Sequence, residues 1–128
     1  MNGTTKINFD NCASITLLKK QFDLTSLSIN VDEAQLFASV IVRMELLSKP
    51  DMQTDEERQI LEFLGRLKII PLNEEIEKKA IEIRRSTKLK LPDSIVAATS
   101  IILDAILITD DAHLLNLSWP GLKTQAII

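Results

Sequence analysis

Short apolar runs alternate along the chain with longer segments in which apolar residues recur at helical spacing. The runs predict strands at residues 7–9, 37–42, 69–72, 105–109 and 124–128. Helical spacing predicts helices at residues 12–20, 43–47, 54–67, 74–85 and 92–103, with a short one around 114–115. Segment 26–31 is typical of a loop or edge strand, and 32–39 fits a helix or a strand. Alternating strands and helices predict an α/β fold with a parallel sheet of about five strands, flanked by helices on both faces.

Polar residues mark the starts of three predicted helices. Thr54 and Glu57 have the spacing of a capping box, in which each side chain bonds the backbone amide of the other residue. Asn73 is placed to cap the next helix, whose first turn is acidic. Pro92 suits the first position of the helix that follows. These signals predict where the helices begin.

The chain is expected to form one domain over residues 1–128. Its three Gly and four Pro are spread singly, and no linker, repeat or low-complexity tract interrupts the pattern. The longest apolar stretch, residues 101–108, contains Asp104 and is far too short to span a bilayer. The polar N-terminus and the single cysteine predict a cytoplasmic location, and no association with a membrane is expected.

Composition narrows the chemistry. The single cysteine, Cys12, and the single histidine, His113, exclude disulfide frameworks, Cys/His zinc sites and Cys–His nucleophilic pairs. The net charge of −3 predicts no strong nonspecific attraction to nucleic acid, and by itself argues against a phosphate-rich substrate. The reactive groups that remain are carboxylates.

Acidic residues stand where ligands bind in parallel sheets, beyond the carboxyl ends of the strands. Asp10 ends the first predicted strand, and Glu45 lies just past the second. Asp93 opens the helix before the buried strand that Asp110–Asp111 follow. Four converging carboxylates repel one another unless a cation neutralises them. An oxygen-only set suits Mg²⁺ or Mn²⁺, which can activate water against a phosphodiester without a histidine.

Each acid also has a structural interpretation. Asp93 suits a helix N-terminus, Asp10 can be a turn residue, and Asp110–Asp111 can form a turn followed by a helix cap. Glu45 is the most informative of the acids, because apolar neighbours surround it and an unpaired buried acid is costly. A glutamate on an exposed helical stripe is nevertheless the commoner case.

Three segments resemble a PIN-domain protein of the VapC toxin type. They are Phe9-Asp10-Asn11-Cys12 with the helix after it, Ser39-Val-Ile-Val-Arg-Met-Glu45-Leu-Leu47, and Leu89-Lys-Leu-Pro-Asp93-Ser94 followed by Leu107-Ile-Thr-Asp-Asp111. The last is the most specific, and the similarity extends over nearly the whole chain. The resemblance implies a PIN-like fold and an Mg²⁺- or Mn²⁺-dependent endoribonuclease with an RNA substrate. It also implies a homodimer silenced by a cognate antitoxin.

Carried over residue by residue, the family's metal-binding acids fall on Asp10, Glu45, Asp93 and Asp111. The family's Thr-x-Asp spacing matches Thr109 and Asp111, which leaves Asp110 as a neighbour or substitute. The first of the three segments departs from the Asp-Thr-Asn that is common in the family, because Asn11 and then Cys12 follow Asp10. This departure supports an alternative, a catalytically degenerate PIN domain that binds a protein or RNA partner without cutting.

Further residues have weaker claims. Arg43 could bind phosphate or form a surface ion pair, and Lys88 and Lys90 could line the site entrance or a solvated loop. Cys12 is expected to be buried or a poor ligand, and His113 to be a surface residue. Arg84 and Arg85 are expected to complement a helix C-terminus, and Trp119 to anchor packing. A receiver-like phosphoacceptor or a haloacid-dehalogenase-like phosphatase would need a further acid beside the first strand, and none is present.

Overall fold

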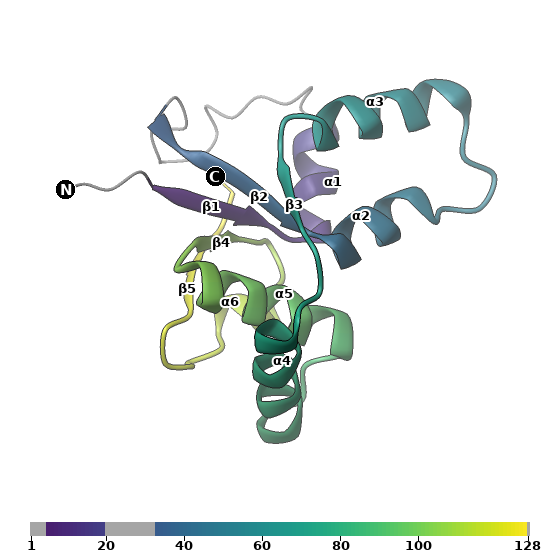
Figure 1. Ribbon diagram of the computed structural model, residues 1–128. Helices are drawn as coiled ribbons and strands as arrows, with labels where there is room; N and C mark the ends of the chain where they lie inside the picture. The colour runs from purple at the N-terminus through teal and green to yellow at the C-terminus, as the bar shows by residue number, and fades with distance from the viewer. Residues whose placement is uncertain (1–4, 20–32, 128) are drawn as a thin grey trace.

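The computed structural model describes residues 5–19 and 33–127 (Figure 1). The predicted loop or edge at 26–31 lies outside these residues. The strands are β1 (Lys6–Phe9), β2 (Gln35–Ser39), β3 (Lys68–Ile70), β4 (Ile106–Ile108) and β5 (Lys123–Gln125). The helices are α1 (Asn11–Lys19), α2 (Val40–Leu47), α3 (Thr54–Leu64), α4 (Glu74–Ser86), α5 (Leu91–Leu103) and α6 (Ala112–Leu115).

The strands form one parallel sheet in the order β3-β2-β1-β4-β5. This confirms the predicted α/β fold with a five-stranded parallel sheet. The chain builds outward from β1 through β2 to β3, then returns to add β4 on the other side of β1. The strand order therefore reverses between β1 and β4, and such a switch point opens a crevice beyond the carboxyl ends of the two strands.

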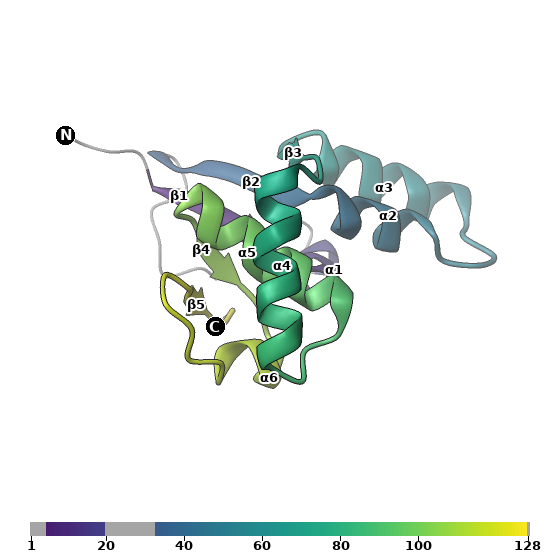
Figure 2. The ribbon, with the colours of Figure 1, turned by 60° about the horizontal axis from the view of Figure 1, so that its bottom comes forward.

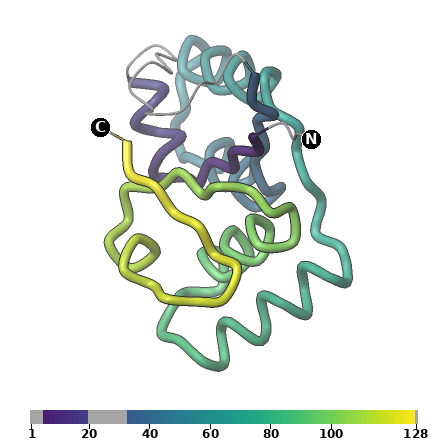
Figure 3. The backbone as a smooth tube through the Cα atoms, turned by 90° about the vertical axis from the view of Figure 1, so that its left-hand side faces the viewer, coloured from purple at the N-terminus to yellow at the C-terminus, as the bar shows by residue number. Residues whose placement is uncertain are grey.

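Neighbouring residues of β1 show how both faces of the sheet are covered, because successive side chains of a strand point to opposite faces. The Phe9 ring packs edge to face on Phe63 of α3, with 6.0 Å between the ring centroids. On the other face, Asn8 Nδ2 donates a hydrogen bond to Ser100 Oγ of α5 at 2.8 Å. In Figures 1 and 3, α1 and α3 accordingly lie on one side of the sheet and α4 and α5 on the other. Figure 2 shows α4 crossing in front of α5.

The apolar run at 37–42 is only half strand, so the predicted boundary there is wrong. The strand ends at Ser39 and α2 begins at Val40. Ser39 has extended backbone angles, and its hydroxyl accepts a hydrogen bond from the Ile41 amide. This N-cap starts a helix through β-branched residues, and Val42 is completely buried beneath it.

The other helix starts were predicted with mixed success. The capping box of Thr54 and Glu57 is wrong, because the N-cap is Gln53 and no side chain caps α3. The Asn73 cap is confirmed by a 2.8 Å hydrogen bond from the Ile76 amide to its side chain. Pro92 lies in the first turn of α5, one residue later than predicted. Among the helices of the described residues, none is long and apolar enough to cross a membrane.

Candidate active site

A cavity of about 220 Å³ lies beyond the carboxyl ends of β1 and β4, at the point where the strand order reverses. It is lined by Asp10, Asn11, Cys12, Glu45, Lys90, Pro92, Asp93, Val96 and Asp111. The four predicted acids therefore line a single cavity. Each comes from a different part of the fold: the end of β1, the last turn of α2, the first turn of α5 and the residue before α6.

Asp10 is the most deeply placed of the four, with 4% of its surface exposed. Its Oδ1 accepts a 2.6 Å hydrogen bond from the Ala13 amide, and its Oδ2 accepts one from the Thr109 hydroxyl. Burial raises the pKa of Asp10 to about 6, against the lowering effect of these hydrogen bonds. The charges of Asp93 and Asp111 add to the increase.

Thr109 connects Asp10 to Asp111. Besides donating to Asp10, its hydroxyl oxygen accepts a 3.0 Å hydrogen bond from the Asp111 amide. The Asp111 carboxylate in turn caps α6, because its Oδ1 accepts from the His113 amide at 2.8 Å. The turn after β4 is therefore fixed on the cavity wall. Sequence reasoning used Thr109 only as a spacing mark and missed this role, although a hydroxyl at the end of a wholly apolar strand was a usable signal.

Asp110 faces elsewhere. Its Oδ2 accepts from the Thr16 hydroxyl at 3.2 Å, and its Oδ1 accepts from the Ile127 amide at 3.1 Å. It ties α1 and the C-terminal segment to the end of β4 and does not line the cavity. The geometry thus favours Asp111 over Asp110 as the fourth acid.

Glu45 and Asp93 occupy the outer part of the cavity. The apolar sequence neighbours of Glu45 do not bury it: Glu45 is exposed and Met44 is 57% exposed. Partial desolvation of its carboxylate nevertheless raises the pKa of Glu45, and the charge of Asp93 raises it further. Desolvation and then the charge of Asp111 raise the pKa of Asp93, while Lys90 and His113 act in the opposite direction. The carboxylates therefore repel one another.

This mutual repulsion, and a donor set made of carboxylate oxygens, fit a hard divalent cation such as Mg²⁺ or Mn²⁺. Within the described residues, however, no three His, Cys, Asp or Glu side chains are arranged to hold a metal ion as they stand. The structure shows a carboxylate-lined cavity rather than a formed coordination shell.

The weaker candidates differ in their exposure and in whether they line the cavity. Cys12 was expected to be buried or a poor ligand. It is exposed on the cavity wall, so the first of these alternatives is wrong, and desolvation of its thiol raises the pKa of Cys12. Arg43 is exposed and does not line the cavity. His113 is exposed, and Trp119 is partly buried against the core, as expected. Arg84 and Arg85 lie in the last turn of α4, also as expected.

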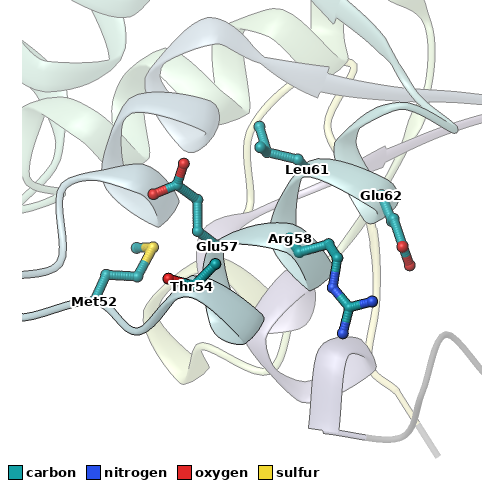
Figure 4. Close-up of a pocket in the computed structure, with 6 residues that line it drawn as sticks. All are labelled: Met52, Thr54, Glu57, Arg58, Leu61 and Glu62. Atoms are coloured by element: carbon teal, nitrogen blue, oxygen red, sulfur yellow. The ribbon is translucent and has the colours of Figure 1, made fainter.

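Two larger hollows lie near α3. One of about 500 Å³ runs between α1, α2 and α3 and shares Asn11 and Glu45 with the carboxylate cavity. The other, of about 480 Å³, is drawn in Figure 4 and shares no lining residue with that cavity. Its side chains are spread along α3 and do not converge on one point (Figure 4). Neither has the concentration of acids found at the switch point.

Comparisons with known proteins show the family to which the chain belongs. The PIN domain model matches residues 12–120. A VapC ribonuclease of Pyrococcus furiosus is 30% identical over 117 residues, which cover 83% of this chain and 74% of the relative. The chain therefore belongs to the PIN-domain family, and within it to the VapC type.

Solved structures show the same fold at lower identity. VapBC2 from Rickettsia felis, bound to a promoter DNA fragment, superposes with a TM-score of 0.81 at 20% identity, over 95% of this chain and 98% of that one. A DNA-bound VapBC from Salmonella typhimurium gives 0.78 at 17% identity, over 97% and 99%. A toxin–antitoxin complex from Klebsiella pneumoniae gives 0.69 at 24% identity, over 91% and 94%.

Proposed function

We propose that this protein is a divalent-metal-dependent endoribonuclease that acts as the toxin of a toxin–antitoxin pair. The observation that carries the proposal is the convergence of four carboxylates from separate elements on one cavity, at the switch point of the sheet. The VapC relative is named a ribonuclease, and the solved neighbours include toxin–antitoxin complexes.

In this proposal Asp10, Glu45, Asp93 and Asp111 would hold Mg²⁺ or Mn²⁺, and the bound ion would act as a Lewis acid toward the phosphoryl oxygen and lower the pKa of a water. Hydrogen bonds from Thr109 and the Ala13 amide fix the orientation of the Asp10 carboxylate, and with it the direction of its remaining lone pairs. Asp111 is fixed by its cap on α6. Hydrogen bonds therefore hold two of the four acids in place, which reduces the free energy that these two lose to reorganisation when the ion binds.

The direct test is RNA cleavage with Mn²⁺ by the wild type and by Asp93→Asn and Asp111→Asn. Each substitution is expected to reduce the cleavage rate at least 100-fold, because it removes a carboxylate from the cavity. Asp110→Asn is the matched control: it removes the same charge one residue away, from a side chain bonded to Thr16 and Ile127. Equal activity in the wild type and Asp93→Asn would refute the proposal.

The proposed toxin role has its own test. Expression of the wild type is expected to arrest growth, and expression of Asp93→Asn is not. Co-expression of the small protein encoded by an adjacent upstream reading frame is expected to restore growth and to co-purify with the chain. Growth arrest by both variants would contradict a toxicity that depends on RNA cleavage.

The exposure of Cys12 on the cavity wall supports the second candidate, a degenerate PIN domain that binds without cutting. A thiol takes the place of the polar residue that the family commonly has there. Calorimetric titration with Mn²⁺ distinguishes the two functions. Tight binding that is lost in Asp10→Asn supports the nuclease, whereas no Mn²⁺ binding by the wild type supports the binding module.

A further inference from the structure

A second cavity adjoins the carboxylate cavity and differs from it in charge. It has a volume of about 240 Å³ and shares Asp93, Asp111 and Lys90 with its neighbour. The remaining wall is formed by Lys88, Leu89 and His113. We call Lys88, Lys90 and His113 the cationic rim. It borders the acids on the side away from α2, since Glu45 lines only the first of the two cavities.

The backbone holds the two lysines in a fixed arrangement. Leu89 is buried, with 5% exposure, between exposed Lys88 and Lys90 in the segment that joins α4 to α5. Thr87 and Lys90, at the two ends of this segment, have extended backbone angles, and both lysines line the second cavity. The Leu89 amide donates to the Thr87 hydroxyl at 3.1 Å. The Lys90 carbonyl accepts from both the amide and the hydroxyl of Ser94, at 2.9 and 3.0 Å.

Among the residues that the structure describes, the lysines of the rim have no ion-pair partner. Five other cations of the described residues (Lys49, Arg58, Lys78, Lys79 and Lys123) form ion pairs with acids. Lys88 and Lys90 form none with any described residue. Lys90 and His113 are nevertheless close enough to Asp93 to oppose the rise of its pKa. Exposed, unpaired cations beside an acidic site are placed to attract an anion that the acids alone would repel.

We infer that the cationic rim binds an internucleotide phosphate next to the one that is cleaved, and so positions single-stranded RNA over the carboxylate cavity. This inference rests on the proposed ribonuclease function and assigns a positioning role to Lys88, Lys90 and His113. The two lysines supply charge, and the His113 ring supplies an N–H donor. The acids and their cation would then engage the scissile phosphate while the rim holds its neighbour.

The test compares Lys88→Gln/Lys90→Gln with Lys68→Gln/Lys78→Gln, which removes the same charge. Lys68 is exposed at the amino end of β3, an edge strand of the sheet, and Lys78 is exposed on α4. The probe is a fluorescent single-stranded RNA 12-mer, titrated with Mn²⁺ in a Glu45→Gln background that is expected not to cleave it. The rim variant is expected to bind at least tenfold more weakly at 0.1 M salt. Its log–log salt slope is expected to fall by about 0.7, the value for one phosphate contact on a single strand.

Further measurements separate positioning from folding and from metal loss. In a chain that keeps Glu45, the Lys88→Gln/Lys90→Gln variant is expected to raise KM at least tenfold and to leave kcat within about twofold of the wild type. The Lys88→Arg/Lys90→Arg variant is expected to restore KM. The Mn²⁺ affinity of the Lys88→Gln/Lys90→Gln variant is expected to stay equal or increase, because removing positive charge beside the acids favours a cation. Weaker RNA binding then cannot be due to a lost metal.

Two results would overturn the inference. One is equal RNA affinity of the rim and control variants while the wild type cleaves RNA, a result that leaves the proposed function standing. The other is unchanged RNA affinity together with weakened binding of the cognate antitoxin, which would assign the rim to an acidic protein segment instead. A wild type that binds the 12-mer but never cleaves it contradicts the proposed function alone.

Discussion

The Asp10 carboxylate is buried and accepts two hydrogen bonds. None of the groups that shift its pKa carries a positive charge. Its pKa rises from 3.8 to about 6. Between these two pH values the folded chain keeps a proton that the unfolded chain has lost, so this group favours folding at low pH and loses that contribution as pH rises. The loss amounts to about 3 kcal/mol above pH 6.

Asp10→Asn is therefore expected to be more stable than the wild type at pH 7 in the presence of EDTA, by up to about 3 kcal/mol. The advantage is expected to shrink toward pH 4, where the wild-type carboxyl is also uncharged. Urea unfolding of both proteins at pH 4, 5, 6 and 7 measures it. A stability difference that does not change with pH would contradict the raised pKa.

Thr109→Val tests the hydrogen bonds that link Asp10 and Asp111. The substitution removes a hydroxyl that donates to the Asp10 carboxylate and accepts from the Asp111 amide. Stability is expected to fall by about 1–3 kcal/mol, because the amide is left partly buried without a partner. The Thr109 bond lowers the pKa of Asp10, so its loss is expected to move the rising limb of the RNA-cleavage pH profile to higher pH.

Thr99→Val is the matched control for this prediction. Thr99 is equally buried, but among the described residues its hydroxyl bonds only the Ile95 carbonyl of its own helix. We expect the control to leave the pH profile of cleavage unchanged. If both variants shift the profile alike, Thr109 acts through packing and not through Asp10.

At the scale of elements, helix starts decide where the acids lie. Ser39 caps α2, which carries Glu45, and Asn73 caps α4, which carries none of the four acids. Ser39→Ala and Asn73→Ala are each expected to cost about 1 kcal/mol in thermal or urea unfolding. Only Ser39→Ala is expected to reduce the Mn²⁺-dependent cleavage rate, because it loosens the helix that presents Glu45. Equal activity in the two variants would show that Glu45 needs no such support.

The same elements show how far the sequence predicts the structure. The number, order and type of elements were predictable because apolar runs and helical spacing reflect burial. The five-stranded sheet confirms the predicted strands. The boundary at Ser39 was missed because β-branched residues favour strands, whereas a side-chain cap and the burial of Val42 make them helical here. The cap at Thr54 failed because Gln53 already holds the extended conformation before α3.

The acids were predictable as a set, since the carboxyl ends of parallel strands meet at one edge. The contacts of each individual acid could not be predicted. The Thr-x-Asp spacing favoured Asp111 but left Asp110 as a possible substitute. Tertiary contacts separate the two, because Asp110 is bonded to Thr16 and Ile127 whereas Asp111 lines the cavity. The cationic rim also depends on tertiary structure, because His113 is distant in sequence from Lys88 and Lys90.

At the scale of the whole molecule, the net charge of −3 understates how unevenly charge is distributed. Four of the eighteen acids line one cavity, and the adjoining cationic rim borders it. One bound divalent ion changes the net charge to −1 and removes repulsion where RNA would approach. The overall charge therefore does not exclude a nucleic-acid substrate.

A cation that relieves this repulsion binds the folded chain better than the unfolded one, so it must stabilise the fold. Mn²⁺ at about 100 times its Kd is expected to add about 2.7 kcal/mol, and so to raise Tm by roughly 10 °C. EDTA is expected to reverse the shift. Asp93→Asn is expected to abolish most of it, whereas Asp110→Asn removes the same charge outside the cavity and is expected to retain it. Equal Mn²⁺ stabilisation of all three proteins in a calorimetric scan would mean that the ion binds elsewhere than among these four acids.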